Sequence, residues 1–379
     1  MARESKPNFV FVFADDWGWG DLGCYGHPFV KTPNLDRMAS EGILFSQFYV
    51  CSGVCSPSRA AAVTGLFPSR LAIHGHFANH QQNDARAMPD WLDPQLQTYM
   101  HLLRQSGYVI GHFGKWHLGS GLGAPEPFAY GIDECRVNAG NGPQLDFPSA
   151  YGSHRSMQGY HNGKEIPWPS KHIRWKSSQV IVDESLSFIE RHQHRPFLVN
   201  VWLNDTHATL DPTPEQLEVY SDLFPEELQE KYVGAPAIYY AAVTDSDRHI
   251  GRLLDRLDQL GLRDNTVVIF SADNGPEDIV IRNASHSGVG SPGPFRGRKR
   301  SLYEGGIRTP FILRWPAGGA RPDTVDDATS LCAVDLLPTF CQLAEVALPG
   351  GITLDGEDMS AAFRGTPVQR TKPLLWEWR

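Results

Sequence analysis

Four groups of polar side chains in this sequence follow directly on apolar, β-favouring runs. They are Asp15-Asp16, Lys115-Trp116-His117, Asp205-Thr206-His207 and Asp273-Asn274-Gly275. Such runs are typical of strands buried on both faces of a parallel sheet. In an open α/β sheet, ligands bind at the carboxyl ends of the strands. We therefore expect these four groups to converge on one site, although they are far apart in the sequence.

Asp15, Asp16, Asp273 and Asn274 all carry hard oxygen donors. This donor set suits Ca²⁺ or Mg²⁺ better than zinc, which prefers nitrogen and sulfur. Taken singly, an Asp-Asp pair or an Asp-Asn-Gly sequence is more often an ordinary turn at the end of a strand. Because both occur directly after buried runs, we expect one divalent cation here, Ca²⁺ or alternatively Mg²⁺.

The segment from Cys55 to Gly65 (CSPSRAAAVTG) has the pattern of a helix start. Pro57 suits the first turn, three alanines propagate the helix, and Gly65 ends it. Cys55 is then predicted near a helix N-terminus, where free N–H groups and the helix dipole favour an anion. The competing interpretation is a buried structural cysteine, which is the usual role of a lone cysteine.

The composition of the 379 residues narrows the class of protein. A net charge of −9 argues against a nucleic-acid binder, which needs a basic surface. No apolar run approaches the roughly 18 residues that a membrane span requires. Six cysteines are too few for a disulfide framework in a chain of this length. The polar N-terminus predicts a cytoplasmic protein, or a periplasmic or secreted one from which a signal peptide was removed.

Strand-like runs alternate with helical patterns along the chain. The runs are Asn8–Ala14, Tyr108–Phe113, Pro196–Leu203, Thr266–Phe270 and Pro310–Trp315. Helices are predicted from Pro33 to Gly42 and over Leu96–Ser106, Gln179–His192 and Ala235–Leu260. This alternation predicts an α/β fold with helices on both faces of a sheet. The stretch Gly119–Lys176 has little periodicity and is predicted to be a long excursion, a common place for substrate loops.

The sequence resembles the type I sulfatases of the alkaline phosphatase superfamily. Their modification motif, Cys-x-Pro-Ser-Arg followed by Thr-Gly, is matched from Cys55 to Gly65, and their second motif by Gly107-Tyr108 and 114–119. The resemblance also covers Asp15-Asp16, Thr206-His207, Asp273-Asn274-Gly275 and Lys299 ahead of Tyr303-Glu304-Gly305-Gly306. It implies a large, mostly parallel sheet between helices, with a catalytic domain over 1–345. Residues 346–379 are expected to start a small C-terminal antiparallel subdomain that is largely absent, as if truncated.

The resemblance further implies that a maturation enzyme oxidises Cys55 to formylglycine, which hydrates to a geminal diol. One hydroxyl of a diol attacks sulfur, and the other drives release of sulfate and return of the aldehyde, so one hard step becomes two. Residue 55 would join the four oxygen donors around the metal. Lys115 and Lys299 would hold the sulfate and Arg59 would orient the diol. His207 would be the acid for the leaving oxygen, and His117 the base that releases sulfate.

The expected substrate is a sulfated small molecule or carbohydrate, with the N-acetylhexosamine and galactose sulfatases the nearest in character. His76 and His286 are weaker candidates for substrate contact. The chain has 15 histidines, and a histidine chosen at random is more often structural or exposed to solvent than functional. Two alternatives stay open. One is a phosphonate or phosphate monoester hydrolase of the same superfamily; the other is a non-catalytic binding protein on this scaffold with Cys55 unmodified.

Overall fold

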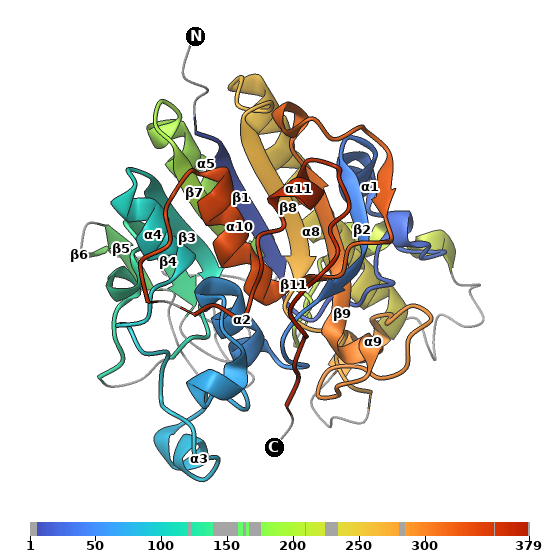
Figure 1. Cartoon of the computed structure of the whole chain (residues 1–379). Helices are drawn as coiled ribbons and strands as arrows, with labels where there is room; N and C mark the ends of the chain where they lie inside the picture. Colours follow the sequence, from blue (N-terminus) through green and yellow to red (C-terminus); the bar gives the residue numbers. More distant parts are fainter. Residues whose placement is uncertain are drawn as a thin grey trace.

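The computed structural model describes residues 6–119, 123–138, 158–161, 164–166, 176–208, 210–223, 234–279, 285–351 and 353–377. Its strands form a single sheet in the order β10-β2-β9-β8-β1-β7-β3-β4-β5-β6, with β11 beside β2 (Figure 1). The strands are β1 (Asn8–Ala14), β2 (Ile43–Tyr49), β3 (Val109–Lys115), β4 (Glu134–Asn138), β5 (Gln158–His161), β6 (Lys164–Ile166), β7 (Phe197–Trp202), β8 (Thr266–Ala272), β9 (Arg308–Arg314), β10 (Thr324–Asp326) and β11 (Leu331–Cys332). The central strands β8, β1, β7 and β3 run parallel, as the continuous apolar runs predict.

Helices cover both faces of this sheet. They are α1 (Pro33–Ser40), α2 (Cys55–Thr64), α3 (His80–Asp84), α4 (Tyr99–Gln105), α5 (Ser177–His192), α6 (Pro214–Glu218), α8 (Gly234–Gln259), α9 (Glu304–Ile307), α10 (Leu336–Leu343) and α11 (Ser360–Phe363). Phe9, Phe11 and Phe13 of β1 pack with α2, α4 and α10 on one face. Val10 and Val12 point the other way and pack with α1, α5 and α8. The predicted mostly parallel sheet between helix layers is confirmed.

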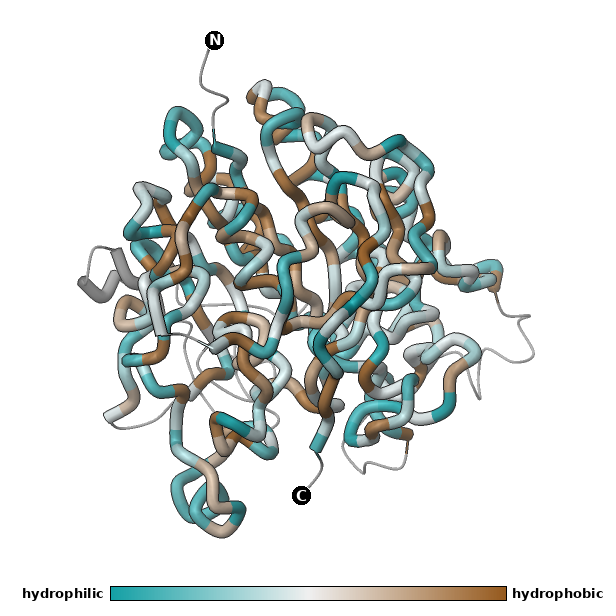
Figure 2. The backbone as a smooth tube through the Cα atoms, viewed as in Figure 1, coloured by the Kyte–Doolittle hydropathy of each residue, from teal (hydrophilic) through white to brown (hydrophobic). Residues whose placement is uncertain are grey.

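The interior is apolar and the outer loops are polar, as the tube in Figure 2 shows. All seven residues of β1, β3 and β8 are buried. No helix of the described residues is both long enough and apolar enough to cross a membrane. Residues 346–377 pack on the face of α2 and α10 through Met359, Phe363 and Trp376. The division into domains at residue 346 stays a prediction.

Some elements differ from the sequence-based expectations. β9 occupies the predicted run at Pro310–Trp315 but pairs antiparallel with both β2 and β8. Its register with β2 shifts between Phe45 and Phe48, opposite Pro310, which has no N–H to donate to a partner. β4, β5 and β6 lie within the segment predicted to be a loop excursion. β2 was not predicted, because its sequence ILFSQFY mixes apolar and polar residues.

Candidate active site

Cys55 is the first residue of α2 and is almost fully buried. The extended backbone of Val54 precedes it, and Gly65 ends the helix in the left-handed conformation (φ 68°), as the sequence predicts. Burial raises the pKa of the Cys55 thiol to about 12, although Lys115 and Lys299 act to lower it. An unmodified Cys55 is therefore a neutral thiol at pH 7, despite its place at a helix N-terminus.

Two pairs of polar residues meet beside Cys55 because β1 and β8 are neighbours in register. Ala14 of β1 is opposite Ala272 of β8, so that the residues following both strands lie side by side. The Asp16 N–H donates to Asp273 Oδ1 at 3.3 Å, and Asn274 Nδ2 donates to Asp16 Oδ1 at 2.7 Å. Asp16 adopts φ 61°, a left-handed conformation that is uncommon outside glycine and ends β1 in a sharp turn.

Three buried cations face these carboxylates. Lys115 Nζ lies 2.6 Å from Asp15 Oδ2, and Lys299 Nζ lies 2.7 Å from Asp16. Arg59, one helical turn beyond Cys55 on α2, forms an ion pair of 2.7 Å with Asp273. The sequence groups of β1, β3 and β8, together with α2 and the loop that carries Lys299, thus form one cluster.

Burial is the largest influence on the pKa values of the carboxylates in this cluster. Burial raises the pKa of Asp16 and of Asp273 to about 6, and Lys299 and Arg59 offset this only in part. The pKa of Asp15 is well below its usual value, because Lys115 and other nearby cations outweigh the effect of burial. A further positive charge among these side chains would stabilise their ionised forms.

The donor set fits a hard divalent cation. The side-chain oxygens Asp15 Oδ1 and Asn274 Oδ1 are buried and have no hydrogen-bond partner among the described residues. Leaving such atoms unpaired costs free energy, so each one calls for a ligand. One ligand atom from each of Asp15, Asp16 and Cys55 lies within 4.8 Å of the others. Carboxylate and amide oxygens around a shared point are the environment that Ca²⁺ and Mg²⁺ prefer.

Two of the predicted histidines border this cluster. His207 Nε2 lies 3.9 Å from Asp16 Oδ2, and its Nδ1 lies 3.0 Å from the Ala208 carbonyl oxygen. Neither ring nitrogen of the buried His117 has a hydrogen-bond partner among the described residues, and its ring centroid is 6.4 Å from that of His76. Burial lowers the pKa of His207 to about 3 and of His76 to about 4, so both are neutral. In the part of the chain that the structure describes, no hydrogen bond or ion pair joins His286 to the cluster.

Sequence reasoning missed Glu277. Its buried carboxylate lies 3.3 Å from Lys299 Nζ and also pairs with Arg300. Burial acts to raise the pKa of Glu277, but Lys299 and Arg300 lower it to about 2. Glu277 therefore holds the Lys299 ammonium together with Asp16. The available signal was its place only three residues beyond Asn274, in the same strand-end loop.

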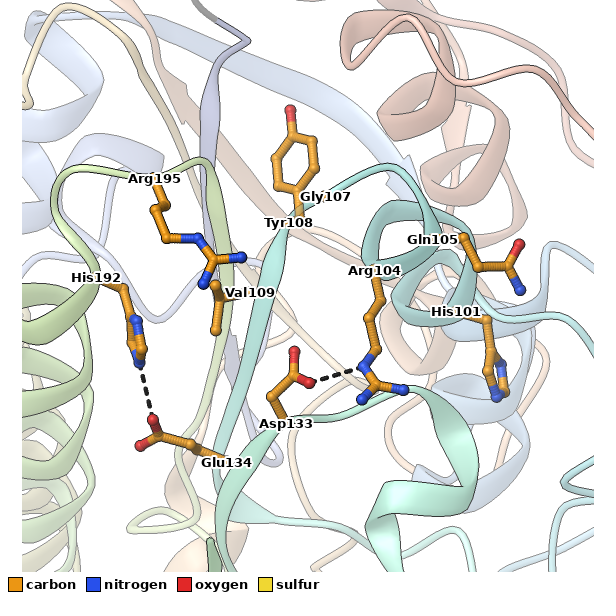
Figure 3. Close-up of a pocket in the computed structure, with 10 residues that line it drawn as sticks. All are labelled: His101, Arg104, Gln105, Gly107, Tyr108, Val109, Asp133, Glu134, His192 and Arg195. Carbon is orange, nitrogen blue, oxygen red and sulfur yellow. Dashed lines mark hydrogen bonds and ion pairs between the residues drawn. The ribbon is translucent and has the colours of Figure 1, made fainter. Parts of the chain in front are cut away.

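A separate cavity of about 670 Å³ lies at the other end of β3, lined by Tyr108 and by Val109, the first residue of the strand. Figure 3 shows two pairs among its side chains, Arg104 with Asp133 (2.7 Å) and His192 with Glu134 (2.8 Å). Lys115, by contrast, ends β3. None of the predicted site residues lines this cavity.

Comparison with known proteins gives a consistent result. The family model described as Sulfatase matches residues 7–346. N-acetylgalactosamine-6-sulfatase of Canis lupus familiaris is 34% identical over 95% of this chain and 66% of its own length. Arylsulfatase A of Homo sapiens is 32% identical over 99% of this chain and 71% of its own length. The chain thus spans about two thirds of the length of these relatives.

Among solved structures, that of Ps i-CgsB in complex with k-i-k-neocarrahexaose superposes with a TM-score of 0.81 at 26% identity. The match covers 98% of this chain and 79% of the other. The architecture is therefore shared along nearly the whole chain.

Proposed function

The chain belongs to the sulfatase family, and from this premise we propose that it hydrolyses sulfate monoesters at the cluster around Cys55. The observation that supports the proposal most strongly concerns two buried oxygens, on Asp15 and Asn274, that have no hydrogen-bond partner in the described part of the chain. They belong to the same cluster as the buried cations Lys115 and Lys299. Such a site offers a place for a metal ion and, next to it, positive charge for an anionic ester.

We infer that residue 55 acts as formylglycine, made from Cys55 by a separate maturation enzyme. The raised pKa of the thiol supports this, because a neutral buried thiol is a weak nucleophile. The hydrated aldehyde would place hydroxyl groups at the start of α2, in the position that the sulfur atom occupies. Intact-mass analysis of the peptide that contains residue 55 tests the conversion.

Asp15, Asp16, Asp273, Asn274 and residue 55 would hold one Ca²⁺ or Mg²⁺. When bound, this ion would supply Lewis-acid activation and neutralise negative charge. Arg59, which is held by its ion pair with Asp273, would orient residue 55 from the next turn of α2. Lys115 and Lys299 would bind sulfate oxygens together with the free N–H groups at the start of α2.

His207 and His117 are proposed to move protons. His207, beside Asp16, would donate a proton to the leaving oxygen of the substrate. The imidazole is neutral in the structure, but a bound sulfate adds negative charge and so raises its pKa. His117, whose ring nitrogens have no hydrogen-bond partner among the residues that the structure describes, would accept the proton whose loss from residue 55 releases sulfate.

For the substrate class we propose sulfated carbohydrates, because the similar proteins include an N-acetylgalactosamine-6-sulfatase and a protein in complex with a neocarrahexaose. His76 lies beside His117 and is a candidate for substrate contact. His286 has no such support.

Parallel assays test the proposal. Purified protein that carries the modified residue 55 is offered an aryl sulfate, an aryl phosphonate and an aryl phosphate, with Ca²⁺ and after chelation. We expect the highest kcat/KM on the sulfate. A higher kcat/KM on the phosphonate or phosphate would assign the alternative hydrolase activity, and no turnover of any ester would favour a binding protein.

A further inference from the structure

Two cysteines outside the proposed catalytic cluster bring their sulfur atoms together. Cys51 Sγ and Cys332 Sγ lie 3.4 Å apart, although 281 positions separate the residues in the sequence. Both side chains are buried, with exposed fractions of 3% and 1%. Within the described part of the chain, no other two cysteine sulfurs make such a contact.

The backbone on both sides of this thiol pair is held by the sheet. β11 pairs with β2 so that Cys332 is opposite Tyr49, two residues before Cys51. The Cys332 N–H donates to Asp335 Oδ2 at 2.8 Å, and Asp335 is itself paired with Arg370 at 2.6 Å. The approach of the two sulfurs is thus set by strand pairing and hydrogen bonds.

The residue before Cys51 is fixed as firmly. The Val50 N–H donates to the Ile307 carbonyl at 2.8 Å, and the Val50 carbonyl accepts from Trp376 Nε1 at 2.8 Å. Cys51 therefore stands on a backbone anchored to two distant parts of the chain. A small rotation of either side chain changes the sulfur separation without moving these anchors.

We propose that Cys51 and Cys332 are a modification site, at which a disulfide bond forms under oxidising conditions. A disulfide requires an S–S distance of about 2.05 Å, so the sulfurs must approach by roughly 1.4 Å. The oxidant is a small peroxide. One sulfur attacks a peroxide oxygen, which yields a sulfenic acid and one water. The second thiol sulfur then attacks the sulfenic sulfur, the S–S bond forms, and the departing hydroxide leaves as water with the thiol proton.

This bond would restrain the segment that leads into α2. Cys51 precedes Cys55 by four residues, and Cys332 ends β11, the strand paired with β2. The bond closes a very long loop, and cross-links of long loops restrict the unfolded chain most. Burial raises the pKa of the Cys51 thiol, so we expect the bond to form slowly in the folded protein.

The test uses the whole chain, first reduced and then incubated for hours with hydrogen peroxide. Peptide mapping without reductant should find the Cys51 and Cys332 peptides joined, with the loss of two hydrogen atoms. Thermal unfolding should show a Tm about 5 °C higher than that of the reduced protein. A second sample is unfolded and refolded in a glutathione redox buffer, which removes any barrier from burial.

Matched variants separate the bond from general oxidation. C51S and C332S should each lose the peroxide-dependent rise in Tm, whereas C341S, another buried thiol, should keep it. The proposal is overturned if neither treatment of the wild-type chain yields the joined peptide. It is equally overturned if C51S shows the same rise in Tm as the wild type.

Discussion

The two ends of β3 carry charged side chains in opposite settings. At the carboxyl end, Lys115 pairs with Asp15 and both side chains are fully buried. At the amino end, Arg104 pairs with Asp133, and these side chains are 54% and 21% exposed. The same distance of contact, 2.6 to 2.7 Å, is therefore found in two different dielectric surroundings.

The comparison shows at which end of β3 charged groups are buried at a cost in the free energy of folding. Water screens the Arg104–Asp133 pair, so this pair contributes little to stability and little is lost without it. The carboxyl-end groups are buried away from water, and among the described residues two of their oxygens have no hydrogen-bond partner. A cluster that is costly in isolation indicates ligands that relieve the cost, and this is why we place the function at this end.

The largest effect should come from removing the nucleophile. We expect Cys55→Ala to lower kcat/KM on an aryl sulfate by about 10⁴-fold or more. Its effect on stability should be small, about 1 kcal/mol, because only one buried sulfur is lost. The matched control is Cys341→Ala on α10, which should retain activity. A Cys55→Ala protein with more than trace sulfatase activity would refute the assignment.

Removal of the proposed metal ion should affect the site at the carboxyl end of β3 and leave the amino end of this strand unchanged. After chelation we expect turnover to fall to background and Tm to drop, with both restored by Ca²⁺. A ligand that binds the folded state stabilises it by mass action, so Tm should rise with Ca²⁺ concentration. At a Ca²⁺ concentration about 100 times the Kd, the free energy of unfolding should increase by about 2.7 kcal/mol. Metal analysis of the purified protein checks the stoichiometry. Full activity in metal-free protein would contradict the site.

A matched pair of substitutions compares the two ends directly. Lys115→Met leaves Asp15 buried without its cation, so we expect the free energy of unfolding to fall by about 3–5 kcal/mol. Arg104→Met removes an exposed pair and should cost at most about 1 kcal/mol. Chemical denaturation of metal-free samples measures both. Equal losses would show that burial does not distinguish the two ends.

The role of His207 predicts a smaller and more selective effect. His207→Ala should lower kcat/KM on a sulfated sugar by about 10²-fold or more, because an alkoxide needs a proton to leave. On an aryl sulfate the loss should be much smaller, since a phenolate leaves unaided. His101→Ala, at the amino-end cavity, should change neither value. Equal losses on both substrates would make Lys299 the next candidate for the acid.

The sequence predicts the parts of this molecule in which local pattern and fold agree. The run NFVFVFA predicts β1, and its alternate residues do face two separate cores. Pro57 predicts the start of α2 near Cys55, and Gly65 predicts its end. β4 was missed because Glu134 and Arg136 interrupt its apolar pattern, and both take part in ion pairs rather than packing.

The same limit applies to the site. Asp15, Asp16, Asp273 and Asn274 could be predicted because each directly follows an apolar run. Glu277 could not, because its function depends on Lys299 and Arg300, which reach it only through the tertiary fold. Residues that act on another side chain leave no periodic signal in the sequence.

The burial of Cys55 would set a time limit on the proposed conversion of its thiol to formylglycine. Lys115 and Lys299 both act to lower the pKa of the Cys55 thiol, and Lys299, which also pairs with Asp16, lies in a loop late in the chain. In the proposed maturation, a second protein would have to reach the thiol before that loop is in place. During synthesis at 5–20 residues per second, the roughly 240 residues between Cys55 and Lys299 take about 12 to 50 s to appear. The fraction of active molecules should therefore depend on translation speed, and slower synthesis should raise it.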